Sequence, residues 1–109
     1  MRHSQLRAFH FVAIYGSFSV AAERLKISQP AVSEQVKKLE QNYDTLLIRR
    51  QNKKITLTNE GRKILLLTKQ LFEVEQQIED YISESGQELA GSIRIIADSA
   101  SHVLNILAA

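Results

Sequence analysis

The sequence has no cysteine, only four glycines and a single proline among its 109 residues. Without cysteine the chain can form no disulfide, no thiolate zinc site and no cysteine nucleophile, and it suits a reducing cytosol. Long apolar runs are also absent, because runs such as Ile64 to Leu67 make about one helical turn and fall far short of a bilayer span. The N-terminal segment MRHSQLRAFHF has no apolar signal core. We therefore expect a cytoplasmic protein with no membrane partner.

Groups that carry out chemistry are scarce as well. The histidines His3, His10 and His102 lie far apart in the sequence, without metal-ligand spacing and without a nucleophile motif. None of the four glycines belongs to a phosphate-cradling loop. The sequence therefore predicts neither an enzyme nor a nucleotide-binding protein, and it predicts no cofactor and no metal.

Positive charge is concentrated in the first half of the chain. Residues 1–63 hold twelve Lys and Arg against five acidic residues, a net charge of +7, whereas residues 64–109 carry −5. A basic half suits a polyanionic partner, although an unevenly charged solvated surface would have the same composition. The length allows one small core, or one core with an extended element, but not two full domains.

Two short helices are predicted near the N-terminus. The first begins near Ser4 and ends at Gly16, where a left-handed cap fits. Its apolar positions recur at helical spacing: Leu6, Phe9, Val12 and Ala13. The second is capped by Ser17 or Ser19. Its expected inner face consists of Val20, Ala21, Ala22 and Leu25, and the two alanines allow another helix to approach closely.

A third helix follows after only a few residues. It is capped by Ser28, carries Pro30 in its first turn and runs to about Glu40. Its inner face is Ala31, Val32, Val36 and Leu39, and its outer face carries Gln29, Ser33, Glu34, Lys37 and Lys38. The short connection forces a tight crossing of the two helices. This arrangement is typical of a helix-turn-helix whose second helix enters the major groove of DNA.

A basic hairpin is predicted next. Residues 46–48 and 55–58 are rich in strand-forming side chains. The segment between them carries four cations: Arg49, Arg50, Lys53 and Lys54. Beside a recognition helix, such a tip can lie along the DNA backbone or enter the minor groove. The alternative, a turn kept soluble by its charges, fits less well next to a helix pair. Residues 1–58 therefore predict a winged helix-turn-helix.

A long helix is expected over residues 59–88, with Thr58 or Asn59 as its cap, and it would be roughly 45 Å long. Its apolar positions are three and four residues apart: Ile64, Leu67, Leu71, Val74, Ile78 and Tyr81. The small domain before it cannot cover so long a stripe, so we expect the same helix of a second subunit to cover it. A lone core helix packed on its own domain is the alternative, which the length disfavours.

Residues 89–109 are predicted as a hinge followed by the start of a second, truncated domain. Residues 92–97 favour a strand and residues 99–107 a short apolar helix, and one strand with one helix forms no stable sheet alone. The expected fold class is thus mainly α: a winged helix-turn-helix, a long dimerisation helix and a short α/β tail.

Four segments, in this order, resemble the N-terminal DNA-binding domain of LysR-type transcriptional regulators: SFSVAAERLKISQPAVSEQVKKLE, LLIRR, LTNEGRKIL and GSIRIIA. The resemblance implies a linker helix that pairs antiparallel with its copy. It also implies a C-terminal effector-binding domain, absent here, that binds a small coinducer. Members of the family bind dyad-symmetric DNA, often as tetramers, and activate or repress their target genes. The resemblance assigns DNA-facing roles to Gln29, Pro30, Ser33 and Glu34, phosphate contacts to Ser28 and Lys37, and the wing-tip cation to Lys53.

In the predicted mechanism, cations hold phosphates and one amide reads a base. The phosphate-binding residues are Lys37, Lys38, Arg49, Arg50, Lys53 and Lys54. Gln29 can pair with adenine through two hydrogen bonds, and Glu34 can accept from a cytosine amino group. Two alternatives stay open: a protein-interaction or dimerisation module that keeps a helix-turn-helix without DNA contact, and another winged-helix family such as the molybdate-sensing regulators. The basic wing disfavours the first, and the tail sequence disfavours the second.

Overall fold

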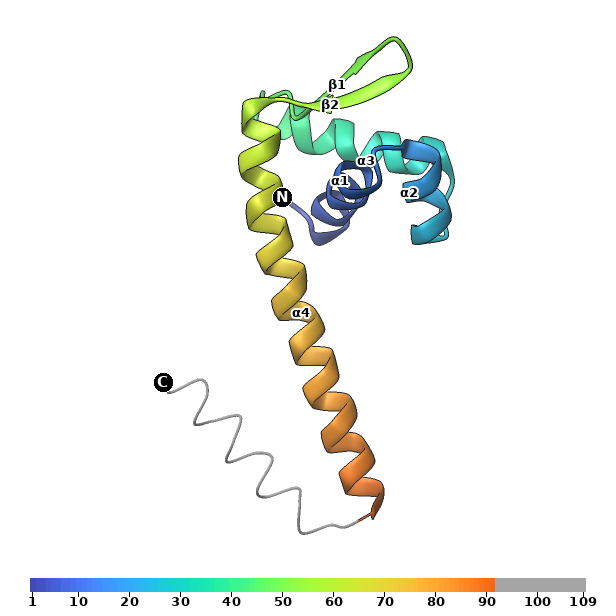
Figure 1. Ribbon diagram of the computed structural model, residues 1–109, viewed down its shortest axis with the longest axis vertical. Helices are drawn as coiled ribbons and strands as arrows, with labels where there is room; N and C mark the ends of the chain where they lie inside the picture. The colour runs from blue at the N-terminus through green and yellow to red at the C-terminus, as the bar shows by residue number, and fades with distance from the viewer. Residues whose placement is uncertain (92–109) are drawn as a thin grey trace. The chain divides into compact units, whose positions relative to one another are not determined.

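The computed structural model describes residues 1–91, with side chains through residue 85. Its elements in chain order are α1 (His3–Tyr15), α2 (Phe18–Leu25), α3 (Gln29–Asn42), β1 (Ile48–Gln51), β2 (Lys54–Leu57) and α4 (Asn59–Gly91). The chain forms two units, of which the first, Met1–Leu71, contains α1 to α3, the hairpin and the start of α4 (Figure 1). The predicted mainly α, winged helix-turn-helix class is confirmed. The strand and helix expected within residues 92–109 lie outside the described residues.

Side-chain caps and a left-handed glycine set the ends of the first helices. The Oγ of Ser17 accepts a hydrogen bond from the backbone N–H three residues on, at 3.1 Å, and Ser28 does the same at 3.2 Å. Each cap satisfies a donor that has no partner inside its helix. α1 ends at Gly16, whose φ of +64° is accessible to glycine without strain. These three predicted helix ends are confirmed.

The core lies among α1, α2 and α3. Phe9 and Val12 of α1 and Val32 of α3 are its largest fully buried side chains. The other core residues are Ala8, Phe18, Ala21, Ala22, Val36, Leu39, Leu47 and Ile48. The last two come from the start of the hairpin, so the wing shares the core of the helices instead of forming its own.

Four predicted details differ from the structure. The sequence predicts Val20 on the inner face of α2, but this side chain is 36% exposed and Phe18 is buried instead. α3 runs two residues past the expected Glu40, and its predicted core residue Ala31 is only half-buried. The strands are Ile48–Gln51 and Lys54–Leu57, so most of the predicted cationic tip belongs to strands.

Thr58 joins the start of α4 to the loop before β1. Its Oγ1 accepts from the Gly61 N–H at 3.0 Å and donates to the carbonyl of Leu46 at 2.6 Å. The Thr58 N–H donates to the Leu47 carbonyl at 3.0 Å. A Cβ on Gly61 would collide with that same carbonyl oxygen, so only glycine fits there. α4 thus begins at the predicted cap, directly against the loop, and continues to Gly91, three residues past the expected end.

His10 connects α1 to α4. Its Nδ1 lies 2.9 Å from the Oγ1 of Thr68, and that hydroxyl donates to the Leu65 carbonyl at 3.1 Å. Because a hydroxyl has one proton, this geometry makes the His10 Nδ1–H the donor to Thr68. Burial lowers the pKa of His10, and the nearby Lys69 lowers it further, so the neutral ring is favoured.

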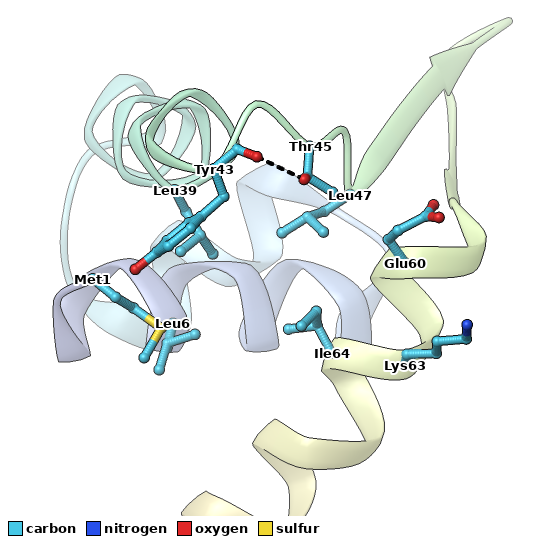
Figure 2. Close-up of a pocket in the computed structure, with 9 residues that line it drawn as sticks. All are labelled: Met1, Leu6, Leu39, Tyr43, Thr45, Leu47, Glu60, Lys63 and Ile64. Carbon is cyan, nitrogen blue, oxygen red and sulfur yellow. Dashed lines mark hydrogen bonds between the residues drawn. The ribbon is translucent and has the colours of Figure 1, made fainter.

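An apolar groove of about 480 Å³ opens in the first unit. Figure 2 shows Met1 and Leu6 on one side, Leu39 and Tyr43 above them, and Ile64, Lys63 and Glu60 of α4 toward the other side. Thr45 also lines this groove, but its hydroxyl donates to the Tyr43 carbonyl at 2.8 Å. Glu60 and Lys63 of α4 also line the groove, but most of its lining is apolar.

In the part of the chain that the structure describes, no helix combines the length and apolarity needed to cross a bilayer. The same residues contain no group of three or more His, Asp or Glu side chains placed to hold a metal ion.

Candidate nucleic-acid interface

α3 presents most of the predicted contact residues on its outward side. Val32 and Val36 are buried against the other helices. The exposed residues are Gln29, Pro30, Glu34, Lys37 and Lys38, whereas Ser33 is half-buried. Pro30 lies in the first turn, where its missing N–H removes no helical hydrogen bond. The Gln29 amide is therefore exposed at the N-terminal end of the helix, from which recognition helices contact base edges.

Some predicted contact residues of α3 already have partners within the chain. The Glu34 carboxylate pairs with the Lys38 ammonium at 3.3 Å, and both side chains are more than half exposed. An exposed pair of this kind is weak, so either group can exchange its partner for one on a ligand. Ser28 uses its hydroxyl oxygen to cap α3.

β1 and β2 pair antiparallel and are joined by a two-residue turn, Asn52 and Lys53. Both turn residues have positive φ, +50° and +63°. This is the signature of a type I′ turn, whose twist matches that of the strands and lets pairing continue up to the turn. The register joins Arg50 to Ile55 and Gln51 to Lys54. This tight turn is the reason that the strands occupy most of the predicted tip and leave Lys53 within the turn.

The hairpin has two chemically different faces, because successive strand residues point to opposite sides. One face, which we call the inner face, consists of Ile48, Arg50, Ile55 and Leu57, whose apolar members are buried or half-buried against the core. The outer face consists of Arg49, Gln51, Lys54 and Thr56, all exposed. The predicted wing cations are thus divided: two on the outer face, Lys53 in the turn, and Arg50 on the inner face.

Arg50 contacts both helices of the helix-turn-helix. Its guanidinium carbon lies 3.8 Å from the centroid of the Phe18 ring at the start of α2. Its Nη2 donates to the Ser33 Oγ of α3 at 3.2 Å. The sequence predicts Arg50 among the phosphate-binding cations; its side chain is exposed beside these two contacts, on the same face of the hairpin as Ile48.

Glu40 fixes the base of the hairpin and was not among the predicted site residues. Its Oε2 accepts from the N–H groups of Leu47 at 2.7 Å and Ile48 at 3.2 Å. Hydrogen bonds to a carboxylate are stronger than neutral ones, so the end of α3 holds the start of β1 firmly. No local pattern reveals this contact, because it depends on how the loop of residues 43–47 folds back.

A polar hollow brings one base-reading candidate together with wing cations. Its lining, from the start of α2, the start of α3 and the hairpin, includes Gln29, Arg50, Lys53 and Lys54. Lys37 belongs to a different hollow, with Glu40 and Leu46. The structure thus gathers Gln29 and three of the four predicted wing cations around one concavity, and it leaves Lys37 outside.

Residues 3–62 match the family described as bacterial regulatory helix-turn-helix protein, lysR family. The chain belongs to this family. The chain is similar to known transcriptional regulators. The RuBisCO operon transcriptional regulator of Allochromatium vinosum is 36% identical over 95 residues, which cover 87% of this chain and 32% of that protein. The HTH-type transcriptional regulator DmlR of Escherichia coli is 32% identical over 94 residues, 86% of this chain and 31% of that protein. The chain spans about a third of the length of these relatives.

Solved structures share the fold. The complex of the CbnR_DBD with DNA has a TM-score of 0.67 and 30% identity, and the match covers 79% of this lysR-family chain and 99% of that one. The complex of the BenM_DBD with catB site 1 DNA has a TM-score of 0.71 and 28% identity, over 77% of this chain and 94% of that one. Full-length OxyR C199D of Pseudomonas aeruginosa matches with a TM-score of 0.69, 32% identity and coverage of 77% and 28%.

The predicted dimerisation stripe of α4 is largely exposed in the single chain. Leu67, Leu71, Val74 and Ile78 are between 41% and 59% exposed. Ile64 and Tyr81 are half-buried, and Ile64 packs against the core of its own domain. The stripe therefore leaves apolar surface for another molecule along much of its length, whereas its first residue, Ile64, already packs within its own chain.

Proposed function

We propose that this lysR-family chain binds DNA sequence-specifically as a homodimer and serves as the DNA-binding part of a transcriptional regulator. The observation that carries the proposal is the hollow shared by Gln29, Lys53 and Lys54. It sets an exposed amide of the recognition helix beside cations of the wing, which suits a base edge next to a phosphate backbone. Similarity to two structures described as protein–DNA complexes supports the proposal.

The roles divide between readout and affinity. The start of α3 enters the major groove, where Gln29 pairs with adenine and Glu34 accepts from cytosine, with Pro30 and Ser33 alongside. The cations outside the inner face bind phosphates and supply salt-sensitive affinity: Lys37, Lys38, Arg49, Lys53 and Lys54. Ser28, at the N-terminus of the same helix, contributes a phosphate contact.

Dimerisation follows from the exposed stripe of α4. The same helix of a second copy covers Leu67, Leu71, Val74 and Ile78, which are exposed in one chain. Two copies related by a dyad present two recognition helices to a dyad-symmetric site. We assign coinducer binding and tetramer formation to the remainder of a longer protein, with residues 59–88 as the linker and residues 89–109 leading into the effector domain.

A protein-interaction module without DNA contact is the alternative function. The outward cations of the hairpin weigh against it, because an interaction module does not need Arg49, Lys53 and Lys54 beside a helix with an exposed Gln29. Selection of bound duplexes from a random DNA pool at physiological salt tests the proposal. Enrichment of a sequence with two dyad-related half-sites supports it, and recovery of unenriched DNA or of none contradicts it.

The enriched duplex then separates the two roles. Gln29→Ala should lower binding to the enriched duplex about tenfold or more while changing binding to a scrambled duplex little. Lys53→Ala should weaken both duplexes alike, with Lys53→Arg as the control that keeps the charge. Gln41→Ala, at the far end of α3, controls for helix substitution. Equal losses on both duplexes for both variants would contradict this division of roles.

A further inference from the structure

We infer that Arg50 is a positioning residue that sets the wing against the recognition helix, and that it does not act as a phosphate-binding cation. The inference rests on the proposed DNA-reading function. It assigns to one side chain the alignment of Lys53 and Lys54 with Gln29 across their shared hollow. The observations that carry it are the contacts that the exposed Arg50 side chain makes with α2 and α3, and its place on the same hairpin face as Ile48 and Ile55.

The contacts of Arg50 have two different directions. Its guanidinium lies over the face of Phe18, a core residue only 7% exposed, at 3.8 Å from the ring centroid. At its edge, Nη2 donates to the half-buried Ser33 of α3 at 3.2 Å. The ring contact limits where the guanidinium can lie, and the hydrogen bond sets the direction of one of its N–H groups. Together they define where the middle of β1 lies relative to α2 and α3.

Only arginine satisfies both contacts at once. A guanidinium is flat, stacks on aromatic rings and has donors in its own plane, whereas a lysine ammonium is a compact, strongly hydrated point charge. Arg50→Lys therefore keeps the charge but loses the combination of stacking and edge donation. The neighbouring Arg49 provides a matched control, because it lies on the outer face of the same strand and its side chain has no hydrogen bond, ion pair or ring contact among the described residues.

The hairpin depends on Arg50 because its other polar attachments are at its base. The Glu40 carboxylate accepts from the N–H groups of Leu47 and Ile48 before and at the start of β1. Thr58, directly after β2, donates to the Leu46 carbonyl at the same base of the hairpin. Toward the turn, Arg50 supplies the directional contact with the helices. A two-stranded hairpin has little stiffness of its own, so without this contact the turn can take a range of positions.

Distance measurements on the protein without DNA test the positioning directly. The chain has no cysteine, so Gln51→Cys near the turn and Gln41→Cys on α3, both exposed, accept spin labels at two sites per chain. Mixing the labelled chain with an excess of the same variant without the two cysteines removes distances between copies. We expect one narrow distance distribution in the parent and in Arg49→Lys, and a clearly broader or shifted one in Arg50→Lys. Ser33→Ala, which removes one of the two contacts, should broaden it less. Identical distributions for Arg49→Lys and Arg50→Lys, with both proteins folded by circular dichroism, would overturn the inference.

The salt dependence and sequence preference of DNA binding give a second test. Loss of a phosphate contact and loss of a positioning residue change these two quantities differently. The probes are the duplex enriched by selection and a scrambled duplex of equal composition. Removing one phosphate-binding cation lowers the slope of log affinity against log salt by about 0.9 per bound chain, which we expect for Arg49→Gln. For Arg50→Gln we expect an unchanged slope, with about tenfold weaker binding to the enriched duplex and about twofold or less on the scrambled one.

A reduced slope for Arg50→Gln, with equal losses on both duplexes, would make Arg50 a phosphate contact and overturn the inference. If the parent protein does not prefer the enriched duplex, the DNA-reading proposal fails. In that case the spin-label distances, which need no DNA, still decide whether Arg50 fixes the wing.

Discussion

Similar apolar side chains are buried in the body of three helices, α1 to α3, but are largely exposed on the long helix α4. In the body, Phe9, Val12 and Val32 are completely buried by one another's helices. On α4, Val74 and Ile78 recur at the same three- and four-residue spacing, yet about half of each remains exposed. The body therefore supplies its own apolar partners, whereas the stripe of α4 needs a second surface. The same periodic pattern of apolar residues can therefore indicate a core or an interface, depending on whether the chain itself provides an apolar surface to pack against it.

The tight packing of the body should be most sensitive at Gly61. Gly61→Ala places a methyl group against the backbone carbonyl of Leu47, which cannot move aside as a flexible side chain could. We expect a loss of about 3 kcal/mol or more in the free energy of unfolding, measured by urea denaturation. Gly16→Ala is the control, because nothing lies near its Cβ and only its left-handed backbone, at φ +64°, is strained. That control should lose about 1–2 kcal/mol. Equal losses would contradict the packing at Gly61.

Two valines test the comparison between body and α4 most directly. Val32→Ala removes methyl groups from a fully buried site and should lower the free energy of unfolding by about 2–3 kcal/mol at any protein concentration. Val74→Ala changes a half-exposed site and should cost less than about 0.5 kcal/mol in dilute protein. If a second copy covers α4, the loss from Val74→Ala grows with protein concentration. A loss that is independent of concentration would contradict pairing at this position.

The attachment at the base of the wing should contribute less than the core. Glu40→Ala removes a carboxylate that accepts from two backbone N–H groups, and we expect a loss of about 1.5–3 kcal/mol in the free energy of unfolding. Amide hydrogen exchange at Leu47 and Ile48 should accelerate selectively. Gln41→Ala, an exposed neighbour, controls for the change in helix composition. Unchanged exchange at both amides in Glu40→Ala would rule out this role.

The smallest expected effect is a pH dependence at the contact of α1 with α4. Because burial and Lys69 lower the pKa of His10, its folded environment disfavours the protonated ring. The stability that this provides is fully present above the unfolded-state pKa, near 6.5, and declines as the pH falls below it. The melting temperature of the parent should therefore fall more between about pH 7.5 and 5 than that of His10→Gln. A parallel pH dependence in both proteins would exclude His10 as its source.

Much of this fold could be predicted because its signals are local. Caps at Ser17, Ser28 and Thr58 and the left-handed Gly16 depend on neighbouring residues, and all four are present as expected. The inner face of α2 could also have been predicted by strict helical spacing. Phe18, Ala21, Ala22 and Leu25 lie three and four residues apart on one face, and Val20 lies off that face, so Phe18 is buried and Val20 is exposed.

The contacts that orient the wing could not be predicted in the same way. The Glu40 carboxylate reaches backbone groups seven and eight residues away, across a loop whose path no periodicity describes. Arg50 meets Ser33 across seventeen residues, and only the alternation from Ile48 indicates which way it points. The position of the strands also depends on the positive φ values of Asn52 and Lys53. Neither residue is the glycine that usually indicates such a turn in a sequence.

The mass of the complex between this chain and its selected duplex tests the central proposal most directly, because it examines DNA reading and pairing through α4 together. Light scattering on the enriched dyad duplex at physiological salt should give two chains per duplex for the parent protein. Ile78→Asp, which places a charge in the exposed stripe of α4, should bind with one chain or much more weakly. One chain per dyad duplex for the parent, or two for Ile78→Asp with unchanged affinity, would contradict a dimer formed through α4.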